Sequence, residues 1–251
     1  MSVDGSPLDL LVRKLGTRAE LQPDDRAALL ALPHTIKSFD TSTYLVREGE
    51  LPGPCAILVS GFAYRHKLTG DGARQIIAVH IPGEALDFQH LYLDEADHNV
   101  QTLTRGEVAL APRQAIRELM SARPAIAKAI MIHTLVEASV FREWILNVGR
   151  RDARARIAHL LCEFAIRLDA QGLTGADGYM LPMTQEQIGD ATGLTAVHVN
   201  RMLKGLEEDG LLSRKGRHVS FPQWQALRDA GDFEQRYLHL SKQLAGDQPD
   251  A

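Results

Sequence analysis

Residues 183–212 restrict the fold more than any other segment of the chain, because they contain two short predicted helices separated by a tight turn. Thr184 and Gln187 form the pattern of a capping box at the start of the first helix. Gly193 ends this helix, and Thr195 caps the next one. Each cap stabilises a helix start by about 1 kcal/mol, so the sequence specifies both starts locally.

The second predicted helix is amphipathic. Its apolar positions recur at helical spacing and form one face, which comprises Val199, Met202, Leu203 and Leu206. The opposite face carries Val197, His198, Arg201 and Lys204. A helix that buries one side and presents a cap threonine, a histidine and an arginine near its start is typical of the recognition helix in a DNA-binding helix-turn-helix.

A basic hairpin is predicted directly after these helices. Residues 211–221, LLSRKGRHVSF, contain two β-prone runs around a turn at Lys215 and Gly216. Such a hairpin is typical of a wing that contacts DNA phosphates. An ordinary helix pair with a solvated face is the simpler alternative, but the short turn, the stop at Gly210 and the basic hairpin together favour DNA. The predicted DNA-binding residues are Thr184, Gln185, Thr195, Val197, His198, Asn200, Arg201, Lys204, Arg214, Lys215 and Arg217.

The distribution of charge matters more than the net charge of −4, which at first argues against nucleic acid. Residues 1–149 carry 15 Lys and Arg against 18 Asp and Glu, whereas residues 150–221 carry 10 against 9. The DNA-binding region is therefore only weakly basic. We expect specificity to come from a locally basic face rather than from a strong overall field.

The amino-terminal half has a different character. Residues 6–32 are predicted to form short helices, and residues 34–112 to form short strands divided by turns, with a hairpin turn at 69–72. Many short strands with frequent Gly and Pro indicate a β-sandwich or barrel. Beyond the wing, residues 222–244 are predicted to form a helical tail, and residues 245–251 to be disordered.

A long helix is predicted between these regions, over residues 124–148. A heptad seam runs along it and comprises Ala127, Met131, Thr134, Ala138, Phe141, Ile145 and Val148. A second stripe, which we expect to pack on the sandwich, comprises Ile126, Ile130, Val140 and Trp144. One stripe would describe an ordinary amphipathic helix, but two stripes require two partners, and the simplest second partner is another copy of the chain.

These signals predict an α+β chain with three parts. A β-sandwich or jelly-roll sensor spans residues 1–122, a dimerisation helix and hinge span 123–151, and a winged helix-turn-helix with a helical tail spans 152–251. We expect Gly149 to break the long helix and Asp152 to cap the next one.

Several classes of protein are disfavoured by what the sequence lacks. It has no run of 18 apolar residues and no signal peptide, so we expect a cytoplasmic protein that does not contact the membrane. Cys55 and Cys162 fall in different predicted domains, and we expect two reduced thiols. No nucleophile elbow, phosphate loop or metalloprotease motif is present, so we do not expect an enzyme.

The order of a β-rich domain, a long helix and a winged helix-turn-helix resembles the Crp/Fnr family of bacterial transcription regulators. The strongest match is TQEQIGDATGLTAVHVNRMLKGLEEDGLL, while VREGE, ILVSGFAYRH and IPGEALDF match more loosely. The resemblance implies a homodimer that regulates transcription and binds two-fold-related half-sites in double-stranded DNA, with RNA polymerase as a candidate partner. Two recognition helices would enter major grooves about 34 Å apart.

The recognition positions implied by the resemblance fall on Thr195, Ala196, Val197, His198 and Arg201. Arg201 matches a position that is usually arginine and can contact guanine through two hydrogen bonds. In the family, the position of Ala196 is often Arg or Pro, and that of Val197 is often a base-reading Glu or Ser. Here both side chains are apolar and cannot hydrogen-bond, although Val197 can contact a thymine methyl group. The resemblance therefore implies a target sequence that differs from those of better-known relatives.

The sensor region departs from the cyclic-nucleotide-binding members of the family. Where these members carry a glutamate for the ribose and an arginine for the cyclic phosphate, the alignment places Phe88 and His98. Asp94, Glu95 and Asp97 add negative charge nearby, which argues against a cyclic nucleotide. An iron–sulfur cluster needs four cysteine ligands, and the chain has only two cysteines. The candidate effector-pocket residues are Phe88, His98 and Asn99.

Haem is a candidate cofactor, because five of the ten histidines lie in or beside the sensor: His66, His80, His90, His98 and His133. No spacing among them forms a metal-binding motif, so no metal ligands are assigned. The leading interpretation is a DNA-binding regulator that is either effector-controlled or constitutive, with an unknown effector. The alternative is a haem or small-molecule sensor that acts mainly through protein partners.

Overall fold

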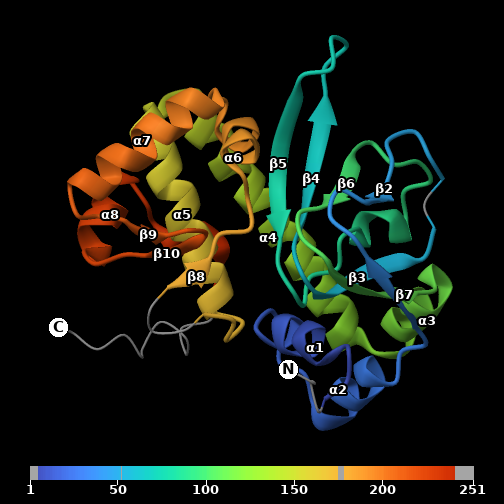
Figure 1. Ribbon diagram of the computed structural model, residues 1–251. Helices are drawn as coiled ribbons and strands as arrows, with labels where there is room; N and C mark the ends of the chain where they lie inside the picture. Colours follow the sequence, from blue (N-terminus) through green and yellow to red (C-terminus); the bar gives the residue numbers. More distant parts are fainter. Residues whose placement is uncertain (1–4, 52, 175–177, 241–251) are drawn as a thin grey trace. The chain divides into compact units, whose positions relative to one another are not determined.

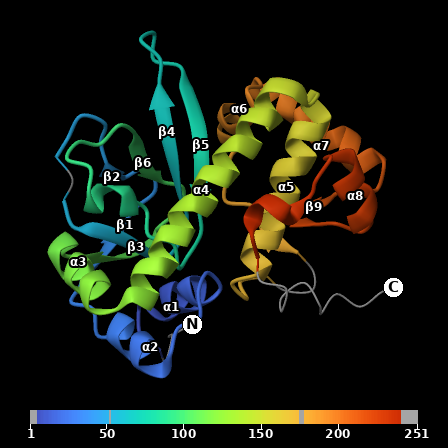
Figure 2. The same cartoon turned by 180° about the vertical axis from the view of Figure 1, so that it is seen from behind.

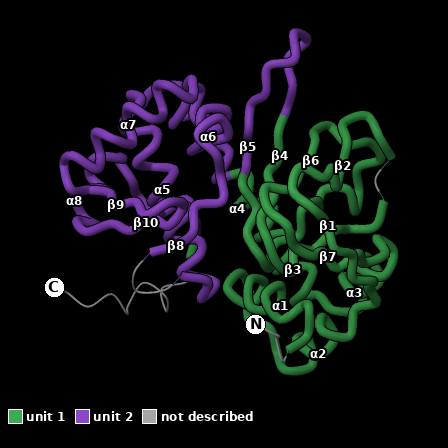
Figure 3. The backbone as a smooth tube through the Cα atoms, viewed as in Figure 1, with its two compact units in different colours: residues 1–66, 79–138, 240–251 green, residues 67–78, 139–239 purple. Residues whose placement is uncertain are grey.

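The computed structural model describes residues 5–51, 53–174 and 178–240 (Figure 1). The described residues divide into two compact units (Figure 3). The amino-terminal unit contains residues 5–66 and 79–138 together with Leu240, and the carboxy-terminal unit contains residues 67–78 and 139–239. The chain therefore crosses between the units more than once, because a hairpin of the amino-terminal half belongs to the carboxy-terminal unit.

Two antiparallel sheets form the β-rich region. One has the order β1–β7–β3 and consists of β1 (Thr35–Phe39), β7 (Gly106–Ala111) and β3 (Cys55–Ser60). The other has the order β2–β6–β4–β5 and consists of β2 (Tyr44–Val46), β6 (Asn99–Thr102), β4 (Ala63–Leu68) and β5 (Arg74–His80). Phe39, Leu58 and Val108 of the first sheet share a buried core with Ala63 and Val100 of the second. The predicted mixed fold with an amino-terminal β-sandwich is confirmed.

Helices cover the other side of the β1–β7–β3 sheet and form a second core. They are α1 (Asp9–Gly16), α2 (Pro23–Leu30), α3 (Arg113–Ala122), the beginning of α4 (Pro124–Arg150) and the short 3-10 helix η1 (Phe88–Leu91). Leu15, Leu29, Ile57 and Ile126 are almost completely buried in this core. The predicted short helices before the strands are therefore present, and their apolar residues anchor the start of the long helix.

The hairpin between β4 and β5 turns where the sequence predicts it. The amide of Thr69 donates to the carbonyl of Ala73 at 2.9 Å, and the amide of Gly72 donates to the carbonyl of Thr69 at 2.9 Å. The outer part of the hairpin contacts α6 (Gln185–Thr192), because Arg74 Nε donates to Asp190 Oδ2 at 2.7 Å and Gln75 donates to the Asp190 carbonyl at 2.7 Å.

The helix α4 runs without interruption from Pro124 to Arg150 (Figure 2). The expectation that Gly149 breaks it was wrong, because the helix continues through this residue for one more position. The next helix, α5 (Ala153–Asp169), starts as predicted, with the Asp152 carboxylate accepting from the Ala155 amide at 2.9 Å.

The carboxy-terminal unit continues with α6 and α7 (Ala196–Glu208) and a small sheet of order β8–β10–β9. Its strands are β8 (Tyr179–Met180), β10 (His218–Ser220) and β9 (Ser213–Lys215). Behind this wing, the predicted helical tail consists of α8 (Trp224–Ala230) and the 3-10 helix η2 (Gln235–Leu238). The part of the tail beyond residue 240, including residues 245–251, lies outside the described residues.

Candidate nucleic-acid interface

The turn between α6 and α7 is fixed by the caps that the sequence predicts. Thr184 Oγ1 accepts from the Gln187 amide at 3.2 Å, and Gln187 Oε1 accepts from the Thr184 amide at 2.9 Å. Thr195 Oγ1 accepts from the His198 amide at 3.3 Å. Gly193 lies between the helices with φ +68°, a left-handed conformation that glycine adopts without strain. These contacts set the direction in which α7 leaves the turn.

A second glycine permits the close approach of α6 to this turn, and the sequence analysis did not identify it. A Cβ atom at Gly189 would lie 2.4 Å from the Leu194 carbonyl oxygen, so a larger residue would displace the backbone. The sequence does give one sign of this close approach. A glycine in the middle of a short helix lowers the stability of that helix, so its presence there suggests that packing requires it.

The inner face of α7 is buried, as predicted. Val199, Leu203 and Leu206 are at most 1% exposed, and α7 packs on α5 and α6. Arg156 of α5 supports this arrangement from behind, because it donates to the Thr192 carbonyl at 3.1 Å, at the last residue of α6. The recognition surface therefore rests on a rigid base of packed helices.

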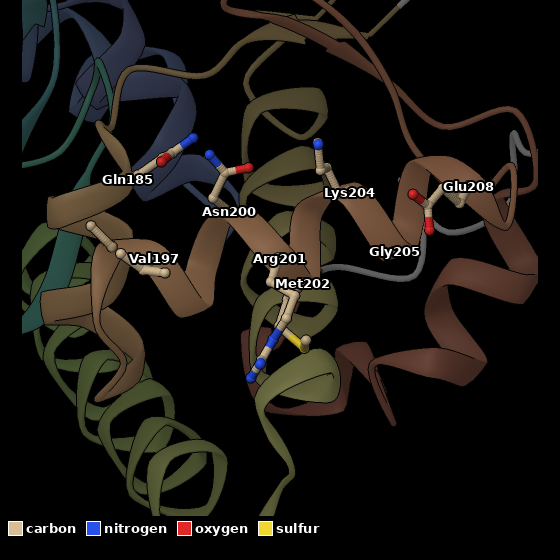
Figure 4. A pocket seen from close by; sticks show the side chains of 9 residues that line it. Gln185, Val197, Asn200, Arg201, Met202, Lys204, Gly205 and Glu208 are labelled. Atoms are coloured by element: carbon tan, nitrogen blue, oxygen red, sulfur yellow. The ribbon is translucent and has the colours of Figure 1, made fainter.

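The outer face of α7 presents the predicted contact residues to solvent. In Figure 4, Val197, Asn200, Arg201 and Lys204 project from one side of the helix, with Gln185 of α6 beside them. Of the predicted set, Thr184, Thr195, Val197, Asn200, Arg201, Lys204, Lys215 and Arg217 are exposed, while Gln185, His198 and Arg214 are half-exposed. Glu208, which was not among the predicted contacts, also lines this surface. Met202 lines it too and is half-exposed, although the helical spacing placed it on the apolar inner face.

The three basic residues predicted for the wing lie in different surroundings. Arg214 pairs with Glu207 of α7, and this pairing lowers the pKa of Glu207. Arg217 donates to the carbonyls of Leu181 and Pro182, and Lys215 lies exposed at the turn. Two of the three side chains therefore have partners inside the protein, which hold the hairpin against α7 and against the residues that follow β8.

The joint between α4 and α5, which we expected to act as a hinge, is bridged by hydrogen bonds. Asn147 donates to the Arg156 carbonyl at 3.2 Å, and Arg156 Nε donates to the Arg151 carbonyl at 2.8 Å. Arg151 also contacts Glu143 at 2.7 Å and Asp232 at 3.1 Å. These contacts tie the end of α4 to α5 and to the tail.

Trp144 contributes to the same joint. Its indole donates to Glu163 Oε2 at 2.9 Å, so Trp144 contacts α5, and it also lines a pocket with Ile76 and Ile77 of strand β5. Tyr237 donates to the same oxygen at 2.8 Å, and Arg167 donates to Glu163 Oε1 at 3.1 Å. Burial beside Glu163 raises the pKa of Tyr237, so the phenol stays protonated as a donor.

The opposite face of α4 is apolar and exposed. Met131, Leu135 and Ile145 are 60%, 62% and 72% exposed, and Leu146 is 43% exposed. Every residue of the predicted heptad seam is at least partly exposed, whereas Ile126 and Ile130 of the second stripe are buried. Leu135 and Leu146 were missed because they lie one position beside the heptad spacing.

The predicted effector residues Phe88, His98 and Asn99 are buried and make contacts within the amino-terminal unit. Asn99 Oδ1 accepts from the Glu48 amide at 3.1 Å, and the ring of Phe88 packs edge-on against His133. His98 Nδ1 lies 2.6 Å from Asp97 Oδ1, while burial and Arg65 lower the pKa of His98 to about 4. Within the part of the chain that the structure describes, no group of His, Cys, Asp or Glu is arranged to hold a metal ion.

The two cysteines are both buried free thiols. Burial raises the pKa of Cys55 and of Cys162 to about 12. Neither thiol is therefore activated as a nucleophile at neutral pH.

Known domains match both halves of the chain. A cyclic nucleotide-binding domain matches residues 36–123, and a Crp-like helix-turn-helix domain matches residues 155–230. The transcriptional activator protein FnrL of Cereibacter sphaeroides is 28% identical over 89% of this chain and 91% of its own length. The nitrogen fixation regulation protein FixK of Rhizobium meliloti is 27% identical over 78% of this chain and 87% of its own length.

Solved structures give the same result. The structure of FixK2 from Bradyrhizobium japonicum superposes with a TM-score of 0.73 and is 27% identical, covering 79% of this chain and 98% of that one.

Proposed function

The chain belongs to the Crp/Fnr family of DNA-binding transcription regulators, and we propose that it binds a two-fold-symmetric DNA site as a homodimer. The proposal depends most on one observation, the exposed apolar face of α4. Large side chains at Met131, Leu135 and Ile145 are each more than half exposed in a single chain. Exposed apolar faces of this kind mark interaction sites, and the heptad spacing suits a second copy of the same helix.

The α4 helix is also long and apolar enough to cross a membrane by length and composition alone. Its two faces are not equivalent, however, because Ile126, Ile130 and Trp144 are buried against other parts of the chain. A helix with one covered face and one apolar face fits a pairing helix better than a span that lipid would surround. We infer that the regulator acts in the cytoplasm, where its DNA is.

The outer face of α7 supports base reading in the major groove. Arg201 has the chemistry to contact guanine through two hydrogen bonds, and Asn200 has the chemistry to contact adenine. Val197 is 82% exposed and suits a thymine methyl group. His198 lies beside these residues with a ring that can bond to a base edge or a phosphate.

The surrounding polar residues suit the DNA backbone. We assign Lys204 and Lys215 to phosphates, together with Thr184, Gln185 and Thr195 at the starts of α6 and α7. We propose that Arg214 and Arg217 also contact phosphates, while they keep their hydrogen bonds within the protein. FnrL is named a transcriptional activator, and on this basis we propose RNA polymerase as a further partner.

Selection of bound fragments from random duplex DNA tests this function. Purified protein without added effector is expected to enrich a site with two half-sites related by two-fold symmetry, about one helical turn apart. Enrichment only after cell-extract metabolites are added would indicate effector control. No enrichment under either condition would contradict sequence-specific DNA binding and favour a sensor that acts through protein partners.

A further inference from the structure

The amino-terminal sandwich contains a cavity of about 190 Å³ that is open to solvent on one side, where exposed residues such as Leu51 and Pro54 line it. Its apolar lining comes from β2, β3 and β7 and includes Leu45, Val46, Ala56, Val108 and Leu110. Pockets for drug-sized molecules measure roughly 300–1,000 Å³. The cavity therefore suits a ligand of only a few non-hydrogen atoms.

A buried carboxylate lines this cavity. Asp87 is 6% exposed, and one of its oxygens, Oδ2, is hydrogen-bonded to Nδ1 of His90. The other oxygen, Oδ1, has no hydrogen-bond partner among the described residues, and the nearest basic atom recorded for it is His98 Nε2 at 3.9 Å. A buried carboxylate oxygen is unfavourable without a donor, so Asp87 is poised to accept a hydrogen bond from a ligand.

The neighbouring guanidinium is engaged elsewhere and does not supply this donor. Arg65 donates to the Leu86 carbonyl at 2.7 Å and lies 3.5 Å from Glu137. Burial raises the pKa of Asp87, while His90 and Arg65 lower it. A cationic donor would favour the ionised carboxylate and offset the effect of burial.

The exposed charged residues of the lining are two basic side chains, Arg47 and Lys37, and one carboxylate, Glu50. The Arg47 guanidinium lies 3.9 Å from the centre of the Tyr44 ring. Stacking on Tyr44 orients this guanidinium. The cavity therefore combines a buried acceptor with groups of both charges closer to solvent, of which the two basic ones can pair with a carboxylate.

We propose that this cavity binds a small zwitterion of the free amino acid class. The ammonium group donates to Asp87 Oδ1, the carboxylate pairs with Arg47 and Lys37, and a short apolar side chain contacts Val46 and Val108. A cyclic nucleotide does not suit the same charges, because it lacks a cation for the buried Asp87 and would place a phosphate in the same small cavity. Binding of the zwitterion does not depend on DNA.

Isothermal titration of the purified full-length protein tests this inference. Each of the twenty amino acids is titrated separately, followed for any binder by the matching amine without the carboxylate and the matching acid without the amine. At least one amino acid is expected to bind with one site per chain. Both truncated compounds are expected to bind at least about tenfold more weakly, which corresponds to roughly 1.4 kcal/mol. Absence of binding by all twenty would overturn the inference.

Two variants locate the site. Asp87→Asn is expected to weaken binding at least about tenfold, and unchanged affinity would assign the ligand to another place. Because Asp87 is buried, Arg47→Gln provides a second variant at an exposed position, with Arg105→Gln as the matched control on the same unit. Arg105 is exposed and pairs with Asp40, and neither residue lines the cavity. DNA selection with the same preparations separates the two proposals, since protein that enriches a DNA site but binds no amino acid contradicts only this inference.

Discussion

Two regions of the chain place their charged groups in opposite ways. On the outer face of α7, Arg201 and Lys204 lie in solvent above the buried apolar residues Val199, Leu203 and Leu206. In the amino-terminal unit, Lys14, Glu84 and His133 are buried, and Lys14 pairs with Glu84 at 2.7 Å. An exposed basic face suits a large polyanion, whereas enclosed charges suit small ligands or internal pairing. The contrast indicates that the two units meet different kinds of partner.

The largest expected effect comes from the surface that joins two copies. Ile145→Asp places a charge on the exposed face of α4 and is expected to convert the dimer to a monomer, since a buried carboxylate would lack a partner. Losing the second recognition helix should weaken operator binding by roughly 100-fold or more, the usual gain from two linked contacts. Sedimentation equilibrium measures the mass, and a gel-shift titration measures the affinity.

Ile36→Asp is the matched control for this prediction. Ile36 is also a partly exposed isoleucine, 44% exposed, but it lies on β1. The control is expected to leave both the mass and the DNA affinity unchanged. A dimeric Ile145→Asp protein would place the interface on another surface.

The enclosed charges of the amino-terminal unit predict a dependence of stability on pH. Burial is the main cause that lowers the pKa of His133 to about 3, and the positive charge of Lys14 is the second. The carboxylate of Glu84 opposes the shift. The unfolded chain, with a pKa near 6.5, binds the proton more strongly, so stability falls as the pH drops from about 6.5 towards 3. At about 1.4 kcal/mol per pH unit the loss is on the order of a few kcal/mol.

Urea unfolding at several pH values measures this loss. His133→Gln is expected to reduce the pH dependence of the free energy of unfolding between pH 6.5 and 4, even if the variant is less stable at neutral pH. His98 and His159, whose pKa values burial lowers to about 4, account for part of the remaining dependence. His34→Gln, at a partly exposed position in the same unit, controls for the loss of a histidine elsewhere. An unchanged slope in His133→Gln would mean that another buried group controls the acid response.

The recognition helices are the region that the sequence alone predicted best. The caps at Thr184, Thr195 and Asp152 act over three residues, so local spacing identified them and the structure confirms them. The outer surface of α7 followed from helical periodicity alone. These features depend on neighbours along the chain, and no distant contact alters them.

Features that depend on distant contacts could not be predicted. Trp144 bonds to Glu163 of α5, and the outer part of the β4–β5 hairpin bonds to Asp190 of α6. No sequence pattern marks Asp87, which the fold buries beside His90. Arg214 and Arg217 looked like free wing residues, but Glu207 and two carbonyl oxygens lie within their reach. Composition shows which charges a chain has, but only the fold decides which of them remain in solvent.

The recognition face predicts an effect of intermediate size. Arg201→Ala is expected to weaken binding to the selected DNA site by about 1–3 kcal/mol and to relax the preference at one base pair in each half-site. Lys215→Ala is the comparison, because loss of a phosphate contact should weaken binding to all sequences and reduce the salt dependence. Gel-shift titrations at several salt concentrations separate the two effects. Equal loss on all sequences in Arg201→Ala would assign Arg201 to the backbone.

The smallest expected effect concerns the cap at the start of α7, and it tests whether this cap acts only on the stability of the helix. Thr195→Ala removes the oxygen that accepts from the His198 amide, and it should destabilise the carboxy-terminal unit by about 1 kcal/mol. Thr195→Ser keeps an acceptor at the same place and should retain most of the stability, as measured by urea unfolding. If DNA affinity falls in Thr195→Ala but not in Thr195→Ser, the cap also orients the start of α7 for base contact. If both variants lose affinity equally while Thr195→Ser remains stable, the threonine methyl group itself contacts the DNA. The cap would then belong to the exposed recognition face as well as to the base beneath it.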